Sequence, residues 1–218
     1  MKILCVVPCL QDDLHSETVS SVLQQPFNVE VAVFTERVEA KSFPAKMSKV
    51  LNNGLMTYNL QQYDYLLRVD GDTVLPKNFL SENLKAEPDV MGYGYAQLIR
   101  VEPFLELMGG KFHPEQDDSY IRYLFAFHGL KSMDYVVQPR RVRETGCNHS
   151  VMYFVEQGRL RFKTGFEPLH MLTCLRFGYK NLFDLAGYFK ALVSREKRFC
   201  FADYVWRLQT AKYSGFLK

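Results

Sequence analysis

Two aspartates, Asp70 and Asp72, stand one residue apart and directly follow an apolar run, Tyr65 to Val69. Gly71 between them permits a tight turn in which the backbone approaches a ligand closely. Paired carboxylates are hard oxygen ligands that suit Mg²⁺ or Mn²⁺, and such a cation would neutralise a diphosphate that bare carboxylates repel. The pattern therefore predicts a divalent-metal site at these two aspartates. An ordinary Asp-Gly turn is the alternative.

Along the sequence around these aspartates, continuous apolar runs alternate with segments whose apolar residues recur at helical spacing. Strands are expected at residues 3–8, 29–34 and 65–69, and helices at 16–25, at about 45–60 and from Pro76. Continuous apolar runs are typical of parallel strands that helices cover on both faces. Open parallel sheets bind ligands outside the carboxyl ends of their strands. Pro8 to Leu10, Thr35 with Glu36, and Asp70 to Asp72 follow strand ends and are expected to share one crevice.

The pattern is less regular in the second half of the chain. Strands are expected at residues 89–103, 135–142 and 150–155, a loop-rich segment at 104–138 and a helix at 168–177. No internal repeat and no Gly/Ser-rich linker divides the sequence, which therefore predicts a single domain.

The composition is that of a globular protein, with 218 residues of which 47% are hydrophobic and 23% charged. No apolar run approaches the ~18 residues that a membrane-spanning helix needs. Asp12 and Asp13 follow the first apolar stretch, where a secretory leader would have its cleavage site. The five cysteines are odd in number and lack metal-ligand spacing. We therefore expect a reduced, cytoplasmic compartment.

Charge is distributed unevenly along the chain. Residues 1–138 contain 12 basic and 18 acidic side chains, whereas residues 139–218 contain 15 basic and 6 acidic ones. The C-terminal part therefore suits an anionic partner, such as a diphosphate, a lipid head group or nucleic acid, or else forms a solvated face. In residues 197–218, Lys and Arg alternate with Trp, Tyr and Phe. That pattern suits either peripheral contact with the inner face of a membrane or packing of a terminal helix.

Residues 46–55, the Asp70-Gly71-Asp72 turn and Pro76, in this order and spacing, resemble the family 2 glycosyltransferases of GT-A type. In that family a lysine-containing stretch ending in A-L-N-x-G-L precedes a strand that ends in D-A-D or D-G-D. The resemblance implies an α/β GT-A fold, an αβα sandwich around a mostly parallel mixed sheet. It further implies a single domain, 1–218, with a nucleotide-sugar-binding half at 1–100, an acceptor-binding half at 101–198 and a basic aromatic tail at 199–218.

The same resemblance implies which residues bind the donor. They are Asp70 and Asp72 for the cation (Mn²⁺ or Mg²⁺) and the nucleotide, Pro8 and Cys9 for the turn that frames the base, and Glu36, Lys46 and Lys49. Asp72 would lie nearer the metal. Glu36 stands close to where family members commonly have an aspartate that reads uracil. Lys46 and Lys49 are one helical turn apart and would face the diphosphate, although neither falls on the family's basic position.

On the acceptor side, Glu167 corresponds to the second acid of an E-D pair that precedes a G-Y-K motif, here Gly178-Tyr179-Lys180. Phe166 replaces the first acid. In the family the second acid is the general base that takes a proton from the acceptor hydroxyl. The alternative is a carboxylate that complements the dipole of the following helix. His149 and His170 are the candidate acceptor contacts.

The reaction so implied is transfer of one sugar, with inversion, from a nucleotide-sugar donor to a hydroxyl of a glycan, a lipid-linked sugar or a protein. Nucleic acid is not an expected partner of such an enzyme, and the oligomeric state is open. A degenerate GT-A domain that binds sugar or serves in assembly without catalysis is one alternative. A sugar-nucleotide nucleotidyltransferase is another, but it would need a glycine-rich basic loop where residues 8–13 read Pro-Cys-Leu-Gln-Asp-Asp.

Overall fold

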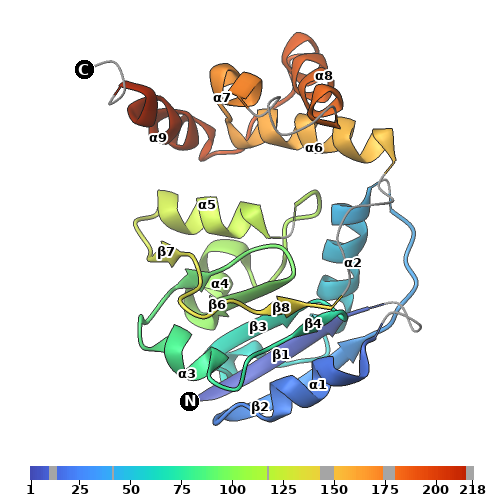
Figure 1. Cartoon of the computed structure of the whole chain (residues 1–218), viewed down its shortest axis with the longest axis vertical. Coiled ribbons are helices and arrows are strands. Elements are labelled where there is room, and N and C mark those ends of the chain that lie inside the picture. The colour runs from blue at the N-terminus through green and yellow to red at the C-terminus, as the bar shows by residue number, and fades with distance from the viewer. Residues whose placement is uncertain (10–13, 41, 117, 143–149, 174–179, 215–218) are drawn as a thin grey trace. The chain divides into compact units, whose positions relative to one another are not determined.

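The computed structural model describes residues 1–218 except 10–13, 41, 117, 143–149, 174–179 and 215–218 (Figure 1). The chain forms two compact units, Met1–Thr145 and Gly146–Lys218. The functional division into a donor half, an acceptor half and a tail, with its boundary at residue 100, stays a prediction.

A six-stranded mixed sheet forms the centre of the N-terminal unit. Its strands are β1 (Lys2–Pro8), β2 (Asn28–Phe34), β3 (Tyr65–Val69), β5 (Val90–Met91), β6 (Ala96–Arg100) and β7 (Ser132–Met133). They lie in the order β2-β1-β3-β6-β5-β7. β1 runs parallel to β2 and β3, β6 is antiparallel to β3 and β5, and β7 is parallel to β5. The three strands expected from apolar runs are confirmed as β1, β2 and β3, which are adjacent and parallel.

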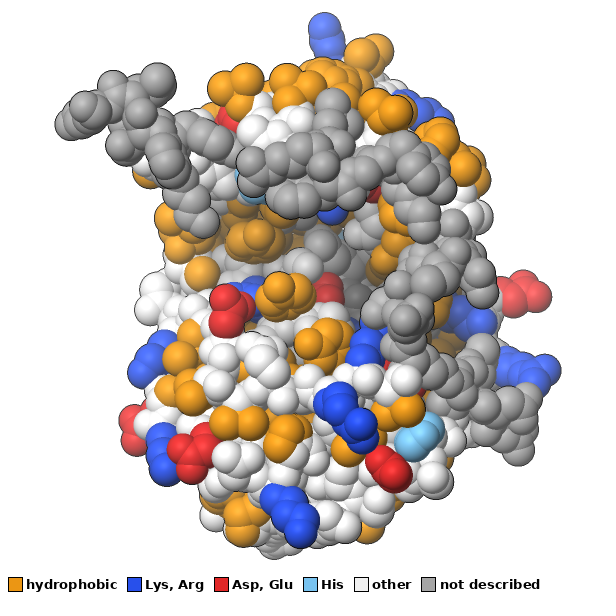
Figure 2. All heavy atoms as spheres, viewed as in Figure 1, with side chains coloured by type: hydrophobic (Ala, Val, Ile, Leu, Met, Phe, Trp, Pro, Cys, Tyr) orange, Lys and Arg blue, Asp and Glu red, His pale blue; other side chains and the backbone are white. Residues whose placement is uncertain are grey.

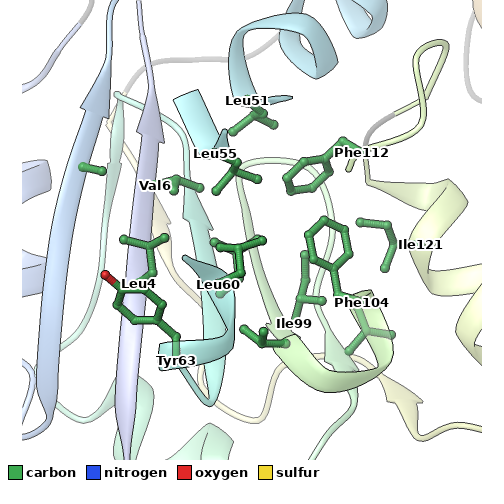
Figure 3. Packing of buried hydrophobic residues seen from close by; sticks show 14 of the residues in the cluster. Leu4, Val6, Leu51, Leu55, Leu60, Tyr63, Ile99, Phe104, Phe112 and Ile121 are labelled. Carbon is green, nitrogen blue, oxygen red and sulfur yellow. The ribbon is translucent and has the colours of Figure 1, made fainter. Parts of the chain in front are cut away.

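Helices cover both faces of this sheet. They are α1 (Ser16–Leu23), α2 (Phe43–Leu55), α3 (Phe79–Leu84), α4 (Val101–Met108) and α5 (Ser119–Phe127), with a 3-10 turn, η1, at Leu60–Gln62. Alternate residues of β1 enter two separate cores, because successive strand side chains point to opposite faces. Leu4 and Val6 pack with residues of α2, α4 and α5, as Figure 3 shows, whereas Cys5 packs with residues of α1 and α3. The expected αβα sandwich is thus confirmed.

A two-stranded ribbon stands apart from the main sheet. β4 (Thr73–Val74) pairs antiparallel with β8 (Arg140–Arg141), and Thr73 lies opposite Arg141. Asn83 of α3 holds the approach to β8, because its Oδ1 accepts hydrogen bonds from the amides of Val136 and Val137 at 2.8 and 3.0 Å. The strand expected at 135–142 is therefore present only as these two residues.

Two further expectations for the second half were wrong. The segment 104–138, expected to be loop-rich, contains most of α4 and all of α5. Residues 151–155, expected as a strand, open helix α6 (Val151–Thr164). Ser150 caps that helix by accepting a hydrogen bond from the Tyr153 amide at 3.4 Å, so local capping prevails over the β-branched composition of the segment.

The C-terminal unit consists of helices α6, α7 (Pro168–Thr173), α8 (Lys180–Val193) and α9 (Ala202–Ser214). Helices α6 and α8 cross at two glycines. A Cβ on Gly158 would overlap the carbonyl oxygen of Asp184, and one on Gly187 would overlap that of Val155. The absence of these two side chains lets the helix backbones touch. Within the described residues, no helix is long and apolar enough to cross a membrane.

Candidate donor-binding site

A cavity of about 200 Å³ opens at the carboxyl ends of β1, β2 and β3, within the N-terminal unit. Its lining residues are Pro8, Cys9, Glu36, Phe43, Lys46, Met47, Val50, Asp70, Gly71, Asp72 and Arg141. This is the edge at which open α/β sheets bind ligands. The structure thus brings together all but one of the residues expected to bind the donor.

Backbone hydrogen bonds fix the turn that carries the two aspartates. The Asp70 amide donates to Tyr95 at 2.8 Å, and the Asp70 carbonyl accepts from the Thr73 amide at 3.0 Å. The Gly71 carbonyl accepts from the His15 amide at 2.7 Å and from the Thr18 hydroxyl at 3.0 Å. The start of α1 therefore holds the turn from one side and the β5–β6 connection from the other.

Each aspartate is paired with an arginine. Asp70 Oδ1 lies 3.0 Å from Nη2 of Arg68, whose side chain is only 5% exposed. Burial raises the pKa of Asp70 above its ordinary value, and the Arg68 charge opposes that shift. Asp72 Oδ2 lies 3.7 Å from Nη2 of Arg141, a longer and more exposed contact. Arg68 is thus a fixed counter-ion within the strand, whereas Arg141 lies at the cavity wall.

The two aspartate carboxylates suit a hard divalent cation that is bound jointly by the protein and a phosphate. Among the residues described, no three His, Cys, Asp or Glu side chains form a cage for a metal ion by themselves. Mg²⁺-like ions are commonly bound through one or two carboxylates together with substrate phosphates and water. Asp70 and Asp72, both at the cavity wall, match that arrangement.

The remaining cavity residues differ in how firmly they are held. Glu36 Oε2 accepts a hydrogen bond at 2.8 Å from Nδ2 of Asn53, which fixes the carboxylate at the rim. Lys46 lines the cavity. Lys49 does not, and its Nζ donates to the Glu39 carbonyl at 3.5 Å. Of the two lysines expected to face a diphosphate, the structure places only Lys46 there.

Sequence reasoning missed Arg141 and the apolar wall made by Phe43, Met47 and Val50. Of these three side chains only that of Val50 is buried. Arg141 belongs to a two-residue strand without periodicity. The basic pair at 140–141 was the only available signal for it.

The acceptor-side candidates lie in the C-terminal unit or outside the described residues. Glu167 is 7% exposed, and its Oε2 accepts a hydrogen bond at 2.9 Å from the amide of His170 in the first turn of α7. Its own amide donates to Oε1 of Gln209 at 2.7 Å. The His170 ring meets the ring of Phe166 edge-on, with 5.6 Å between centroids. His149 lies outside the described residues.

Comparison with known proteins identifies related folds. The sequence matches no protein-family model and no curated protein. The structure is similar to the mannosyltransferase PcManGT from Pyrobaculum calidifontis in complex with GDP-mannose and Mn²⁺, with a TM-score of 0.53 and 14% identity over 99% of this chain and 80% of that one. A mutant of a Drosophila β-1,4-galactosyltransferase 7, in complex with manganese, UDP-galactose and xylobiose, gives a TM-score of 0.48. Its sequence is 15% identical, over 66% of this chain and 71% of that one. TarS of S. aureus in complex with UDP-GlcNAc gives a TM-score of 0.45 and is 12% identical over 78% of this chain and 69% of that one.

Proposed function

Because the chain has the GT-A fold of nucleotide-sugar glycosyltransferases, we propose that it transfers one glycosyl group from a nucleotide-sugar to an acceptor hydroxyl with the help of Mn²⁺ or Mg²⁺. The observation that carries this proposal is the cavity at the strand ends, where the two aspartates, Lys46 and Glu36 lie together. The apolar wall beside them suits a nucleoside, and the charged floor suits a diphosphate.

In this proposal each cavity residue has a distinct task. Asp70 and Asp72 hold the cation, which when bound supplies Lewis-acid stabilisation of the departing diphosphate. The Lys46 ammonium adds a positive charge toward the phosphates. Glu36, oriented by Asn53, accepts a hydrogen bond from an N–H of the base. The backbone of Pro8 and Cys9 frames the base, and the Cys9 amide is engaged with Phe34 at 3.0 Å and so keeps that turn in place.

The reaction is a single displacement. The acceptor oxygen forms a bond to the anomeric carbon while the bond between that carbon and the diphosphate oxygen breaks, and the electron pair leaves with the diphosphate. Configuration at the carbon is inverted. Glu167, a buried carboxylate, takes the proton of the acceptor hydroxyl. His149 and His170 contact the acceptor, a glycan, lipid-linked sugar or protein, and the enzyme works in the cytoplasm.

One observation favours the non-catalytic alternative. The Glu167 carboxylate already serves as a cap for α7 through its hydrogen bond from His170, which a purely structural carboxylate would also make. A GT-A domain that retained its donor cavity without a working base would bind nucleotide and turn nothing over. Release of nucleoside diphosphate from a nucleotide-sugar, with water as acceptor, separates the two functions.

The proposal is tested by calorimetry of GDP and UDP binding with and without MnCl₂. We expect Mn²⁺-dependent binding of one of them. Asp72→Asn removes one ligand charge and should abolish that dependence without lowering the melting temperature. Asp134→Asn is the matched control, because Asp134 is an exposed aspartate of the same unit that pairs with Arg122, and it should behave as wild type. Unchanged Mn²⁺-dependent affinity in Asp72→Asn contradicts the metal assignment, and absence of binding to the wild type contradicts the proposed function.

A further inference from the structure

Arg141 is placed at the cavity by β8, whose short pairing with β4 sets it opposite Thr73. Its guanidinium lies over the ring of Tyr95, 5.5 Å from the centroid, and its Nη2 lies 3.7 Å from Oδ2 of Asp72. The Nε atom is buried and has no hydrogen-bond partner within the described part of the chain. A guanidinium that is stacked on a ring and partly buried thus borders the cavity, and at least one of its N–H groups is not engaged in a hydrogen bond with any residue that the structure describes.

The neighbouring residue shows that this placement is specific. Arg140 precedes Arg141 on the same strand, and successive strand side chains point to opposite sides. The Arg140 side chain is 69% exposed and pairs with Glu17 at 3.5 Å, whereas that of Arg141 is 26% exposed and lines the cavity. The two arginines are neighbours on one strand and carry the same charge, but only the Arg141 side chain faces the cavity.

We propose that Arg141 binds the diphosphate of the donor, which the proposed function identifies as a nucleotide-sugar. A guanidinium presents five N–H donors in a planar fork that matches two phosphate oxygens. Its contact with Asp72 is near the outer limit of an ion pair. A divalent cation held by Asp72 would weaken that attraction and leave the Arg141 guanidinium available to the phosphates. Arg68, buried against Asp70 at 3.0 Å, keeps a fixed structural pairing.

The test compares Arg141→Ala, Arg141→Lys and the matched control Arg140→Ala. Affinities for GDP and UDP are measured by calorimetry in MnCl₂, and melting temperatures report folding. We expect Arg141→Ala to weaken binding by about tenfold to a hundredfold, because it removes charge-assisted hydrogen bonds. Arg141→Lys should lose less, since it keeps the charge without the fork, and Arg140→Ala should stay within about twofold of wild type.

Two results overturn the inference in distinguishable ways. Wild-type affinity in both Arg141 variants, with Asp72→Asn still abolishing Mn²⁺-dependent binding, removes Arg141 from the site and leaves the proposed function standing. Failure of the wild-type protein to bind either diphosphate overturns the proposed function together with this inference. If Arg141→Ala does not fold, the Arg141→Lys variant decides.

A second inference concerns α8 and does not depend on the proposed function. One face of this helix packs on α6 through Gly187 and buries Tyr188 and Ala191. The opposite face is also apolar, with Leu182 at 55%, Phe189 at 41% and Val193 at 80% exposure. These residues follow a spacing of seven and four, which aligns them along one helix face. A helix that is apolar on two sides has a second apolar surface to cover.

The surroundings of this face are basic. Lys190, Arg195 and Lys197 are exposed on α8 or just after it, and residues 146–218 contain 12 basic and 5 acidic side chains. Figure 2 shows hydrophobic side chains gathered over α8 with Lys and Arg beside them. In the tail, by contrast, Phe201 and Val205 are buried, so the described tail uses part of its apolar surface inside the unit.

We infer that the exposed face of α8, made by Leu182, Phe189 and Val193, lies on an anionic lipid surface. Apolar side chains would enter the head-group boundary while the flanking cations meet lipid phosphates, which is how amphipathic interfacial helices bind. The positive charge around the stripe favours an anionic bilayer over an apolar protein partner. Membrane contact by the tail itself stays a prediction.

Vesicle sedimentation tests this surface. The protein should sediment with vesicles of phosphatidylcholine and phosphatidylserine, less with phosphatidylcholine alone, and less at high salt because the charges are screened. Phe189→Ser/Val193→Ser and Lys190→Glu/Lys197→Glu should each reduce sedimentation severalfold. Leu23→Ser/Met56→Ser changes two exposed apolar residues of the N-terminal unit and should leave it unchanged.

Two results contradict the lipid assignment. One is equal sedimentation of the wild type and both α8 variants. The other is a concentration-dependent dimer in analytical ultracentrifugation that Phe189→Ser/Val193→Ser converts to monomer, which would show that a second copy of the chain covers this face.

Discussion

The Glu167 carboxylate has a structural task and a proposed chemical task, and single substitutions separate them. It is 7% exposed and accepts the amide hydrogen of His170 at 2.9 Å. Glu167→Gln preserves shape and an acceptor oxygen, so the cap on α7 remains, but the amide cannot take a proton. Glu167→Ala removes both the cap and the base.

The expected magnitudes follow from these contacts. Loss of a capping hydrogen bond costs about 1 kcal/mol, within a range of about 0.5–2 kcal/mol. Glu167→Ala should therefore lower the free energy of unfolding by roughly 1–2 kcal/mol. Glu167→Gln replaces a charged acceptor by a neutral one and should lose about 0.5 kcal/mol. Loss of a general base should lower turnover by about 10²- to 10⁴-fold in both variants.

Urea unfolding measures the first effect, and release of nucleoside diphosphate from the donor nucleotide-sugar measures the second. Glu196→Gln is the control, because Glu196 is a carboxylate of the same unit that pairs with Arg159 at 2.6 Å. Turnover of Glu167→Gln within threefold of wild type would exclude Glu167 as the base. Equal losses of stability in Glu167→Gln and Glu167→Ala would refute the capping argument.

Three further predictions concern the fold and its pH dependence. Gly158→Ala should lower the free energy of unfolding by more than about 1 kcal/mol, because its methyl group overlaps the α8 backbone; a neutral or stabilising effect in urea unfolding would contradict this. Asn83→Ala leaves backbone groups before β8 without partners and should cost about 2–4 kcal/mol, and calorimetry should show weaker diphosphate binding because β8 carries Arg141. Burial and the hydrogen bond to Glu30 raise the pKa of Tyr63 to about 12. Since the unfolded value is about 10, stability should fall as pH rises from about 10 to 12, and Tyr63→Phe should remove part of that fall in pH-dependent unfolding.

The central strands that carry the cavity could be predicted because residues 3–8 are apolar and residues 65–69 are apolar except for Arg68. β1 and β3 are buried between two helical layers, and a continuous apolar run has few competing explanations. The end of each apolar run also marks the end of its strand. For this reason Pro8, Glu36 and Asp70 could be assigned to the same edge of the sheet. The helix faces were harder to predict. Leu23 is apolar and lies in α1, yet it is 60% exposed, and the cap of that helix is His15, a residue type that is an uncommon helix cap.

The rest of the site depends on contacts between residues distant in sequence. β8 has only two residues, too few for a periodic signal, and Arg141 reaches the cavity because Asn83 of α3 holds the segment before it. The segment after Ser150 is rich in β-branched and aromatic residues, yet a single hydroxyl cap begins a helix there. For Glu167, sequence alone left a base and a helix terminus as alternatives. The structure shows the second directly, and the first stays a prediction.

The distance along the chain between the two sides of the cavity has a consequence for synthesis. Asp72 and Arg141 are 69 residues apart in sequence, and a ribosome adds about 5–20 residues per second. For roughly 3–14 s, a nascent chain therefore presents the aspartates without the arginine that faces them. Strands β1, β2, β3 and β6 come from residues 2–100 and can pair within that interval. A chain that stalls before residue 140 would carry most of a folded sheet and a cavity that lacks its Arg141 wall.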